Sequence, residues 1–222
     1  MRILHISDFH FRKKWFRWLE ERASDFEAVY FTGDFLDASK PNELPRQIEW
    51  VQNWLTEFPV PPFVCSGNHD WFLREPDGDL YSECHWLKSV GNSKITSDGT
   101  NRFLSGVTFE CFGWLAPIRP SLEKSSVLLC HAPPMESAIS RSYGMDSGDF
   151  ELAEVIRILP KGTIILSGHV HTPEKWYARI GMTPVFNPGC DFRAVAPAYI
   201  VVDLQRRVAI YEGKTRDTVA IR

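Results

Sequence analysis

Short apolar segments that stop at polar residues alternate with helix-like patterns at the start of the chain. Residues 2–6 form one such segment and stop at Asp8-Phe9-His10, and residues 28–31 form the next and stop at Gly33-Asp34. Residues 13–23, between them, repeat aromatic and leucine side chains at helical spacing. This alternation predicts parallel strands joined by a helical crossover. Proteins of that class place their sites at the carboxyl ends of the strands, where these polar residues lie.

Two histidines follow a later apolar segment. Residues 163–166 lead into Gly168-His169-Val170-His171. In extended backbone the side chains of residues i and i+2 project to the same side, so His169 and His171 can present both imidazoles to one site. Paired imidazoles suggest a bound metal. For this pair taken alone, the alternative is that one histidine caps a loop and the other lies on the surface.

The remaining patterns predict further helices and strands. Helical spacing occupies residues 48–58 before Pro59, and a second helix is expected from Ser147-Gly148-Asp149 to Pro160. Residues 71–90 are expected to be partly helical, and residues 91–100 to form a polar loop or hairpin. Strands are predicted over residues 62–65, 107–112, 127–130, 185–186, 199–202 and 208–211. Since no repeat or linker interrupts these elements, we expect residues 1–222 to form a single domain.

Composition narrows the class of protein. With 44% hydrophobic and 24% charged residues, the chain is ordinary for a soluble globular protein, and its net charge of -3 argues against bulk nucleic-acid binding. No signal peptide or transmembrane segment is evident. The five cysteines lack paired C-x-x-C spacing, which indicates free thiols in a reducing cytoplasm. Of these, Cys65 and Cys130 lie in apolar runs and are expected to be small core residues.

Residues that ligate metals or transfer protons gather at five predicted strand ends, and five of the seven histidines are among them. Such a set is the pattern expected of a catalytic metal site. Its members are Asp8, His10, Asp34, Asn68, His69, Asp70, His131, His169 and His171.

In order, Asp8-Phe9-His10, Gly33-Asp34, Gly67-Asn68-His69-Asp70, His131 and Gly168-His169-Val170-His171 resemble the motif set of the calcineurin-like metallophosphoesterases. Asn187-Pro188-Gly189 resembles a further signature of small members. The resemblance implies an α/β fold in which two mixed β-sheets form a four-layered αββα sandwich flanked by helices. It also implies two divalent metal ions and hydrolysis of a phosphoester by a hydroxide that bridges them.

On the pattern of that family, Asp8, His10, Asp34 and His171 hold the first metal, and Asp34, Asn68, His131 and His169 hold the second. A carboxylate has two oxygens, so Asp34 can bridge ions about 3.5 to 4 Å apart. Imidazole and oxygen ligands without thiolates suit Mn, Fe, Zn, Co or Ni, and manganese is favoured here.

The same resemblance assigns catalytic roles to His69 and Asp70. His69 would stabilise the phosphoryl oxygens or protonate the leaving oxygen, and Asp70 would orient its ring and raise its pKa. The simpler alternatives are a loop cap for His69 and a helix N-cap ahead of Trp71 for Asp70. Of the two other histidines, His5 is expected to be a buried group beside the ligands and His85 a surface residue.

Differences between this sequence and the motifs of particular branches of the family indicate the class of substrate. Protein serine/threonine phosphatases carry an arginine shortly after the Gly-Asp motif, whereas residues 35–39 contain none, and the Asn-His motif ends here in Asp70 rather than glutamate. The segment from His131 to Pro134 is more similar to small cyclic-nucleotide and general phosphodiesterases. A diester, with one negative charge, needs few cationic clamps. We therefore expect a phosphodiesterase, with a phosphomonoesterase, a protein phosphatase or a non-catalytic scaffold as alternatives.

Several residues could contact the substrate. Arg12-Lys13-Lys14 could meet a second phosphate or a nucleic-acid backbone, or be a solvated helix start. Trp71 and Trp114 could stack on a base, although core packing is the more common role. Arg141 and Arg193 are further candidates. We expect a phosphoester substrate such as a nucleotide, with extended nucleic acid less favoured and no membrane partner.

Overall fold

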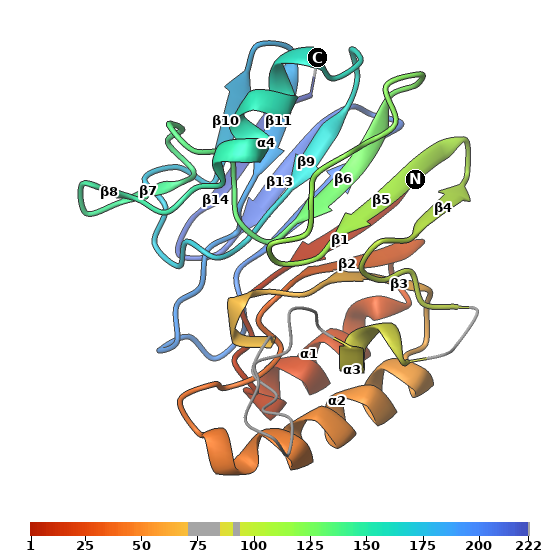
Figure 1. Ribbon diagram of the computed structural model, residues 1–222, viewed down its shortest axis with the longest axis vertical. Coiled ribbons are helices and arrows are strands. Elements are labelled where there is room, and N and C mark those ends of the chain that lie inside the picture. The colour runs from red at the N-terminus through yellow and green to blue at the C-terminus, as the bar shows by residue number, and fades with distance from the viewer. Residues whose placement is uncertain (71–84, 91–93, 222) are drawn as a thin grey trace.

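Two six-stranded sheets form the centre of the protein. A computed structural model describes residues 1–70, 85–90 and 94–221 (Figure 1). The first sheet has the order β14-β13-β12-β1-β2-β3, and the second has the order β10-β11-β9-β6-β5-β4. In the first sheet the strands are β1 (Arg2–Ile6), β2 (Ala28–Thr32), β3 (Pro62–Cys65), β12 (Tyr199–Asp203), β13 (Val208–Glu212) and β14 (Arg216–Ala220). In the second they are β4 (Asn101–Leu104), β5 (Val107–Phe112), β6 (Ser126–Cys130), β9 (Ile164–Leu166), β10 (Tyr177–Ile180) and β11 (Thr183–Phe186).

Helices cover the outer faces of the two sheets (Figure 1). The α-helices are α1 (Lys13–Ala23), α2 (Leu44–Glu57), α3 (His85–Lys88) and α4 (Phe150–Val155). Short 3-10 turns are η1 (Pro41–Glu43), η2 (Asn68–Asp70) and η3 (Ile156–Ile158), and β7 (Arg141–Ser142) pairs with β8 (Met145–Asp146) in a small hairpin. Helices α1, α2 and α3 lie against the first sheet, and α4 lies against the second.

Alternation of side chains along the strands builds the layers. In β2, Tyr30 faces the apolar layer between the sheets, whereas Phe31 faces α1 and α2. In β6, Leu129 faces the same inner layer, whereas Leu128 packs toward α4. Successive residues of a strand point to opposite faces of the sheet. A strand that is buried on both faces therefore has a continuous run of apolar residues in its sequence. The expected four-layered sandwich of two mixed sheets is confirmed.

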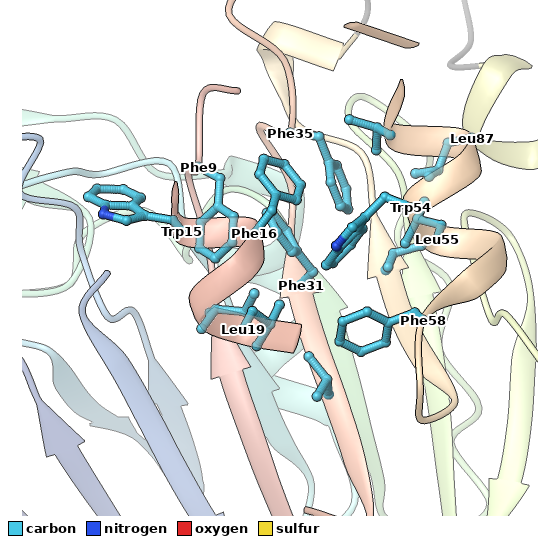
Figure 2. Close-up of a cluster of buried hydrophobic side chains, with 14 of the residues drawn as sticks. Phe9, Trp15, Phe16, Leu19, Phe31, Phe35, Trp54, Leu55, Phe58 and Leu87 are labelled. Atoms are coloured by element: carbon cyan, nitrogen blue, oxygen red, sulfur yellow. The ribbon is translucent and has the colours of Figure 1, made fainter. Parts of the chain in front are cut away.

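Aromatic rings fill the layer between the first sheet and its helices (Figure 2). Phe31 packs on Phe35 with ring centroids 3.9 Å apart, and on Phe9 at 4.6 Å. Phe16 of α1 meets Trp54 of α2 edge to face at 4.9 Å. Such pairs add to the free energy gained by burying the rings themselves. Phe9 and Phe35 belong to loops rather than strands, so this cluster also fixes the chain where β1 and β2 end.

Parallel pairing brings the strand ends together. Strand β2 pairs in parallel with β1 and β3, and in the second sheet β6 pairs in parallel with β5 and β9. The loops that follow β1, β2, β3, β6 and β9 therefore leave the sandwich at its carboxyl edges, as the alternation of strands and helices predicted.

The structure also contains strands that the sequence pattern did not predict. Strands β4, β10 and β14 each pair with a neighbour in an antiparallel hairpin. Their side chains are mostly exposed or half-buried, so they carry no continuous apolar run. The helix predicted to reach Pro160 ends earlier, because α4 gives way to a 3-10 turn, although Asp149 caps its start by accepting from the N–H of Leu152. Within the described residues, no helix is long and apolar enough to cross a membrane.

Candidate metal centre

The loops after β1, β2 and β9 hold their polar side chains by unusual backbone geometry. Asp8, His10, Asp34 and His169 all have positive φ, between 42° and 68°. Residues in this left-handed region cost free energy that the surrounding structure must supply, and they cluster at functional sites. In the loop after β1, the ring of Phe9 is buried in the aromatic cluster, while the flanking Asp8 and His10 face the other way, toward the site.

Close packing explains the motif glycines. A Cβ on Gly33 would clash with Nδ1 of His131, and one on Gly67 would clash with a carboxylate oxygen of Asp34. Both contacts are far inside van der Waals separation, so the two loops can approach only because these residues have no side chain.

One group of ligand-type side chains lies between the ends of β1, β2 and β9. Donor atoms of Asp8, His10, Asp34 and His171 all lie within 4.8 Å of one another. Nε2 of His10 is 3.1 Å from Nε2 of His171 and 3.5 Å from Oδ2 of Asp34. Asp8 and Asp34 are only 0% and 1% exposed. Two imidazole nitrogens facing each other beside two buried carboxylates form a donor set that suits a divalent transition metal.

A second group adjoins the first through Asp34. Its other oxygen, Oδ1, is 3.4 Å from Nε2 of His131. Oδ1 of Asn68 lies 3.0 Å from that nitrogen and 2.9 Å from Nδ1 of His169. One carboxylate thus faces two sets of donors, one with each oxygen. The structure brings together all seven residues for which the sequence predicted metal binding.

Hydrogen bonding selects the nitrogen that His131 offers to a ligand. Its Nδ1 is 2.6 Å from the carbonyl oxygen of Thr32, which can only accept, so Nδ1 carries a hydrogen. In the neutral ring this leaves the lone pair on Nε2, the atom that faces Asn68 and Asp34. His5 was predicted to be buried beside the ligands, and it is fully buried. Its Nε2 lies 3.0 Å from the hydroxyl of Thr32, the residue whose carbonyl oxygen accepts from His131.

Burial and charge separate the pKa values of the histidines. Burial lowers the pKa of His10 to about 4, and burial together with the charge of His131 lowers the pKa of His169 to about 4. For His131 burial acts in the same direction, but the Asp34 carboxylate outweighs it and raises the pKa to about 9. Likewise burial opposes ionisation of Asp34, yet the charge of His131 and its hydrogen bond hold the pKa of Asp34 below its usual value. Burial also opposes protonation of His171, but its hydrogen bond with Asp8 and the charge of Asp8 raise its pKa. His131 and His171 are therefore the two rings on which positive charge is favoured.

Asp70 braces the loops. Its carboxylate accepts hydrogen bonds from the backbone N–H groups of Asp34 at 2.8 Å, Gly67 at 2.9 Å and Leu36 at 3.1 Å. Burial and the nearby Asp34 carboxylate raise the pKa of Asp70 to about 8. Nδ1 of His69 is buried without a hydrogen-bond partner among the described residues, so this nitrogen does not donate to Asp70.

His69 lies at the edge of the first group. Its backbone N–H donates to Oδ1 of Asp34 at 2.9 Å, and its ring packs edge to face on His10 with centroids 4.4 Å apart. A cavity of about 510 Å³ opens here, and His10, His69 and His171 form one of its walls. The ring of His69 is therefore placed to reach a molecule bound in this cavity.

Two residues to which the sequence analysis assigned no role at the metal centre also support its loops. Asn187 donates through Nδ2 to the carbonyls of Gly168 at 2.9 Å and Val170 at 3.1 Å, and so fixes the loop between the two histidines. The sequence feature that could have indicated this role is the position of Asn187 in Asn187-Pro188-Gly189, which resembles a signature of small family members. Asp98 accepts from the N–H and hydroxyl of Ser66, just before the loop after β3, and nothing in its local sequence distinguishes it from a turn residue.

The candidate substrate contacts are spread over different places. Trp114 is half-buried, outside the apolar clusters, and packs on the rings of His169 at 5.2 Å and His131 at 5.6 Å. Arg141 pairs with Asp146 in the β7–β8 hairpin, and Arg193 is exposed. Arg12 lines the cavity at His10. Trp71 and the side chain of His85 lie outside the described residues.

Comparison with known proteins identifies the family. A profile of the calcineurin-like phosphoesterases matches residues 1–173. The chain belongs to this family. No curated protein sequence matches the chain.

Solved structures of the same fold include a dimetal phosphatase from Danio rerio, with TM-score 0.66 and 12% identity over 100% of this chain and 99% of that one. The Thermus thermophilus protein TT1561 has TM-score 0.60 and 15% identity over 100% and 99% of the two chains. An archaeal phosphodiesterase has TM-score 0.51 and 17% identity over 99% of each. At these identities the likeness establishes the fold.

We expect metal binding at the second group to release a proton. In the metal-free protein His131 is protonated below about pH 9, and a metal must replace that proton at Nε2. Metal affinity should therefore rise between about pH 6 and pH 9, with about one proton or more released per protein near pH 7. Calorimetric titration with Mn²⁺ in two buffers of different ionisation enthalpy measures the release. Affinity that is flat over this range would contradict the protonation of His131.

Replacing Asp70 by alanine should destabilise the protein by about 3 kcal/mol or more, because three buried N–H groups lose their acceptor. Relief of the charge repulsion between Asp70 and Asp34 offsets part of this loss. Urea unfolding of metal-free protein measures the change. The control is Asp25→Ala, an exposed residue whose loss should cost less than about 0.5 kcal/mol. Equal stability of the two variants would show that Asp70 does not brace the loops.

Proposed function

We propose that this protein is a two-metal phosphodiesterase. The observation that carries the proposal is the position of Asp34, whose two oxygens face Nε2 of His131 at 3.4 Å and Nε2 of His10 at 3.5 Å. Each of these histidines belongs to its own set of donors. When bound, two divalent ions at these sets supply Lewis acidity and an activated water for attack on phosphorus. Manganese is the proposed metal, since the donors are imidazole, carboxylate and amide oxygen.

Several observations favour a diester as substrate. The residues that directly follow Asp34 are Phe35 and Leu36, both buried in the aromatic cluster. The next cation of this loop, Lys40, is paired with Asp37, so the loop offers the phosphoryl group no unpaired positive charge among its described residues. A monoester dianion needs more positive charge around its three free oxygens than a diester monoanion does. Among the proteins of the same fold, one is described as an archaeal phosphodiesterase.

The runner-up is a phosphomonoesterase, which is favoured by the fold shared with the Danio rerio dimetal phosphatase. A scaffold without activity is the remaining alternative. It is disfavoured because each ligand position of the family holds a residue able to bind a metal.

We assign proton transfer or phosphoryl-oxygen stabilisation to His69. Its ring lines the cavity, so the ring can reach a bound substrate. Asp70 contributes by holding the backbone of Asp34 and Gly67. We also propose a reducing compartment such as the cytoplasm, since Cys65, Cys111, Cys130 and Cys190 are buried free thiols.

Metal-stripped protein, reloaded in turn with Mn, Ni, Co, Zn or Mg, should hydrolyse bis(p-nitrophenyl) phosphate at least about tenfold faster than p-nitrophenyl phosphate. We expect this preference for the diester because few positively charged side chains are available to bind the dianionic phosphoryl group of a monoester. Release of p-nitrophenol measures both reactions. A preference for the monoester would favour the phosphatase alternative, and absence of turnover with every metal, despite two bound ions, would favour the scaffold.

Two substitutions separate metal binding from catalysis. His69→Ala should lower kcat about 100-fold or more while two metals stay bound, because the ring acts on the substrate. Asp34→Asn should lower the metal content, because it removes one charged oxygen from the carboxylate that both donor sets share. Metal analysis and kcat are measured on the same samples. Loss of metal from His69→Ala would contradict the division of roles.

A further inference from the structure

Arg12 lies beside the metal centre and is held by aromatic rings instead of a carboxylate. Its guanidinium carbon is 4.7 Å from the ring centre of Phe192 and 5.4 Å from that of Trp15. Among the described residues, Arg12 forms no ion pair and its side chain makes no hydrogen bond. The five N–H donors of a guanidinium need acceptors, and here water or a ligand must supply them.

Phe192 connects Arg12 to the candidate metal ligands. The ring of Phe192 packs edge to face on His171 at 5.0 Å and on His10 at 5.2 Å, so a single ring separates the guanidinium from the two imidazoles. Stacking on flat faces fixes the plane of the guanidinium and lowers the entropy that it would lose on binding an anion.

Arg12 also lines the cavity of about 510 Å³ that contains His69. A second cation, Lys40, lines the same cavity, but it pairs with Asp37 at 3.3 Å, so these two charges largely cancel. Lys13 adds an ammonium group 5.2 Å from Phe11, another wall residue. Among the described residues that line the cavity, Arg12 is therefore the cation that no carboxylate compensates.

We propose that Arg12 binds a second phosphate group of the substrate, so that the preferred diester carries a further phosphate beyond the one that is hydrolysed. This inference rests on the proposed function, since it names the class of diester for the same site. The planar fork of arginine matches two phosphate oxygens, and charge-assisted hydrogen bonds of this kind are about twice as strong as neutral ones. A nucleotide diester with an additional terminal phosphate has the required chemistry.

The test uses two chromogenic substrates that differ by one phosphate: the p-nitrophenyl ester of thymidine 5′-phosphate and the same ester bearing a 3′-phosphate. With the manganese-loaded protein, kcat/KM should be at least about tenfold higher for the second. Arg12→Gln should lower this ratio by about tenfold, and Arg12→Lys should retain part of it. The matched control is Arg17→Gln, which removes an exposed charge on α1, the helix that Arg12 precedes, and should leave the ratio unchanged.

Binding supplies a readout that does not depend on turnover. Calorimetry should show that thymidine 3′,5′-bisphosphate binds more tightly than thymidine 5′-phosphate, and that Arg12→Gln removes the difference. If neither ester is hydrolysed but this difference in binding is seen, the proposed function fails and the phosphate subsite stands. A wild-type ratio near one, or a ratio that Arg12→Gln leaves intact, would overturn the subsite.

Discussion

Burial of two carboxylates at one end of the sandwich is the constraint around which the rest of the site is built. Asp8 and Asp34 are almost fully buried, and removing such groups from water costs several kcal/mol each unless partners compensate. Backbone N–H groups supply part of the compensation, from His169 to Asp8 and from His69 to Asp34. The histidines supply more, and divalent cations would supply the remainder. Every loop that reaches the site thus contributes a donor or a positive charge.

The aromatic cluster makes this arrangement possible at the level of the backbone. Phe9 lies between Asp8 and His10, and Phe35 follows Asp34. Each loop sends one apolar ring into the cluster (Figure 2). The polar neighbours of these rings face the site. Left-handed backbone costs on the order of 1 to 3 kcal/mol per residue and persists only when the surroundings fix it. The buried rings do so, because turning either loop back would expose a whole phenylalanine side chain to water.

Much of the fold and the donor set could be predicted from the sequence, because both depend on local patterns. Continuous apolar runs revealed the central strands, and the ligand-type residues directly after them revealed the edge where they meet. Edge strands such as β14 were not predicted because their exposed faces carry charged residues, such as Arg216 and Asp217. The hydrogen bonds by which Asp70 and Asp98 hold the backbone of the loops were not predicted either. Asp70 accepts from the N–H of Asp34, 36 residues away, and Asp98 from that of Ser66, 32 residues away, and no local pattern encodes hydrogen bonds to a distant backbone.

The division of the donors between the two sheets has a consequence for the whole sandwich. Asp8, Asp34 and Asn68 extend from strands of the first sheet, whereas the histidines at 131, 169 and 171 extend from strands of the second. Bound ions would tie the sheets together at one end, as a cross-link does, while the apolar layer holds them elsewhere. The free energy of metal binding would then add to that of unfolding. In a cell short of metal, the same chain would open more often at this end and be degraded sooner, so its abundance would follow the metal supply.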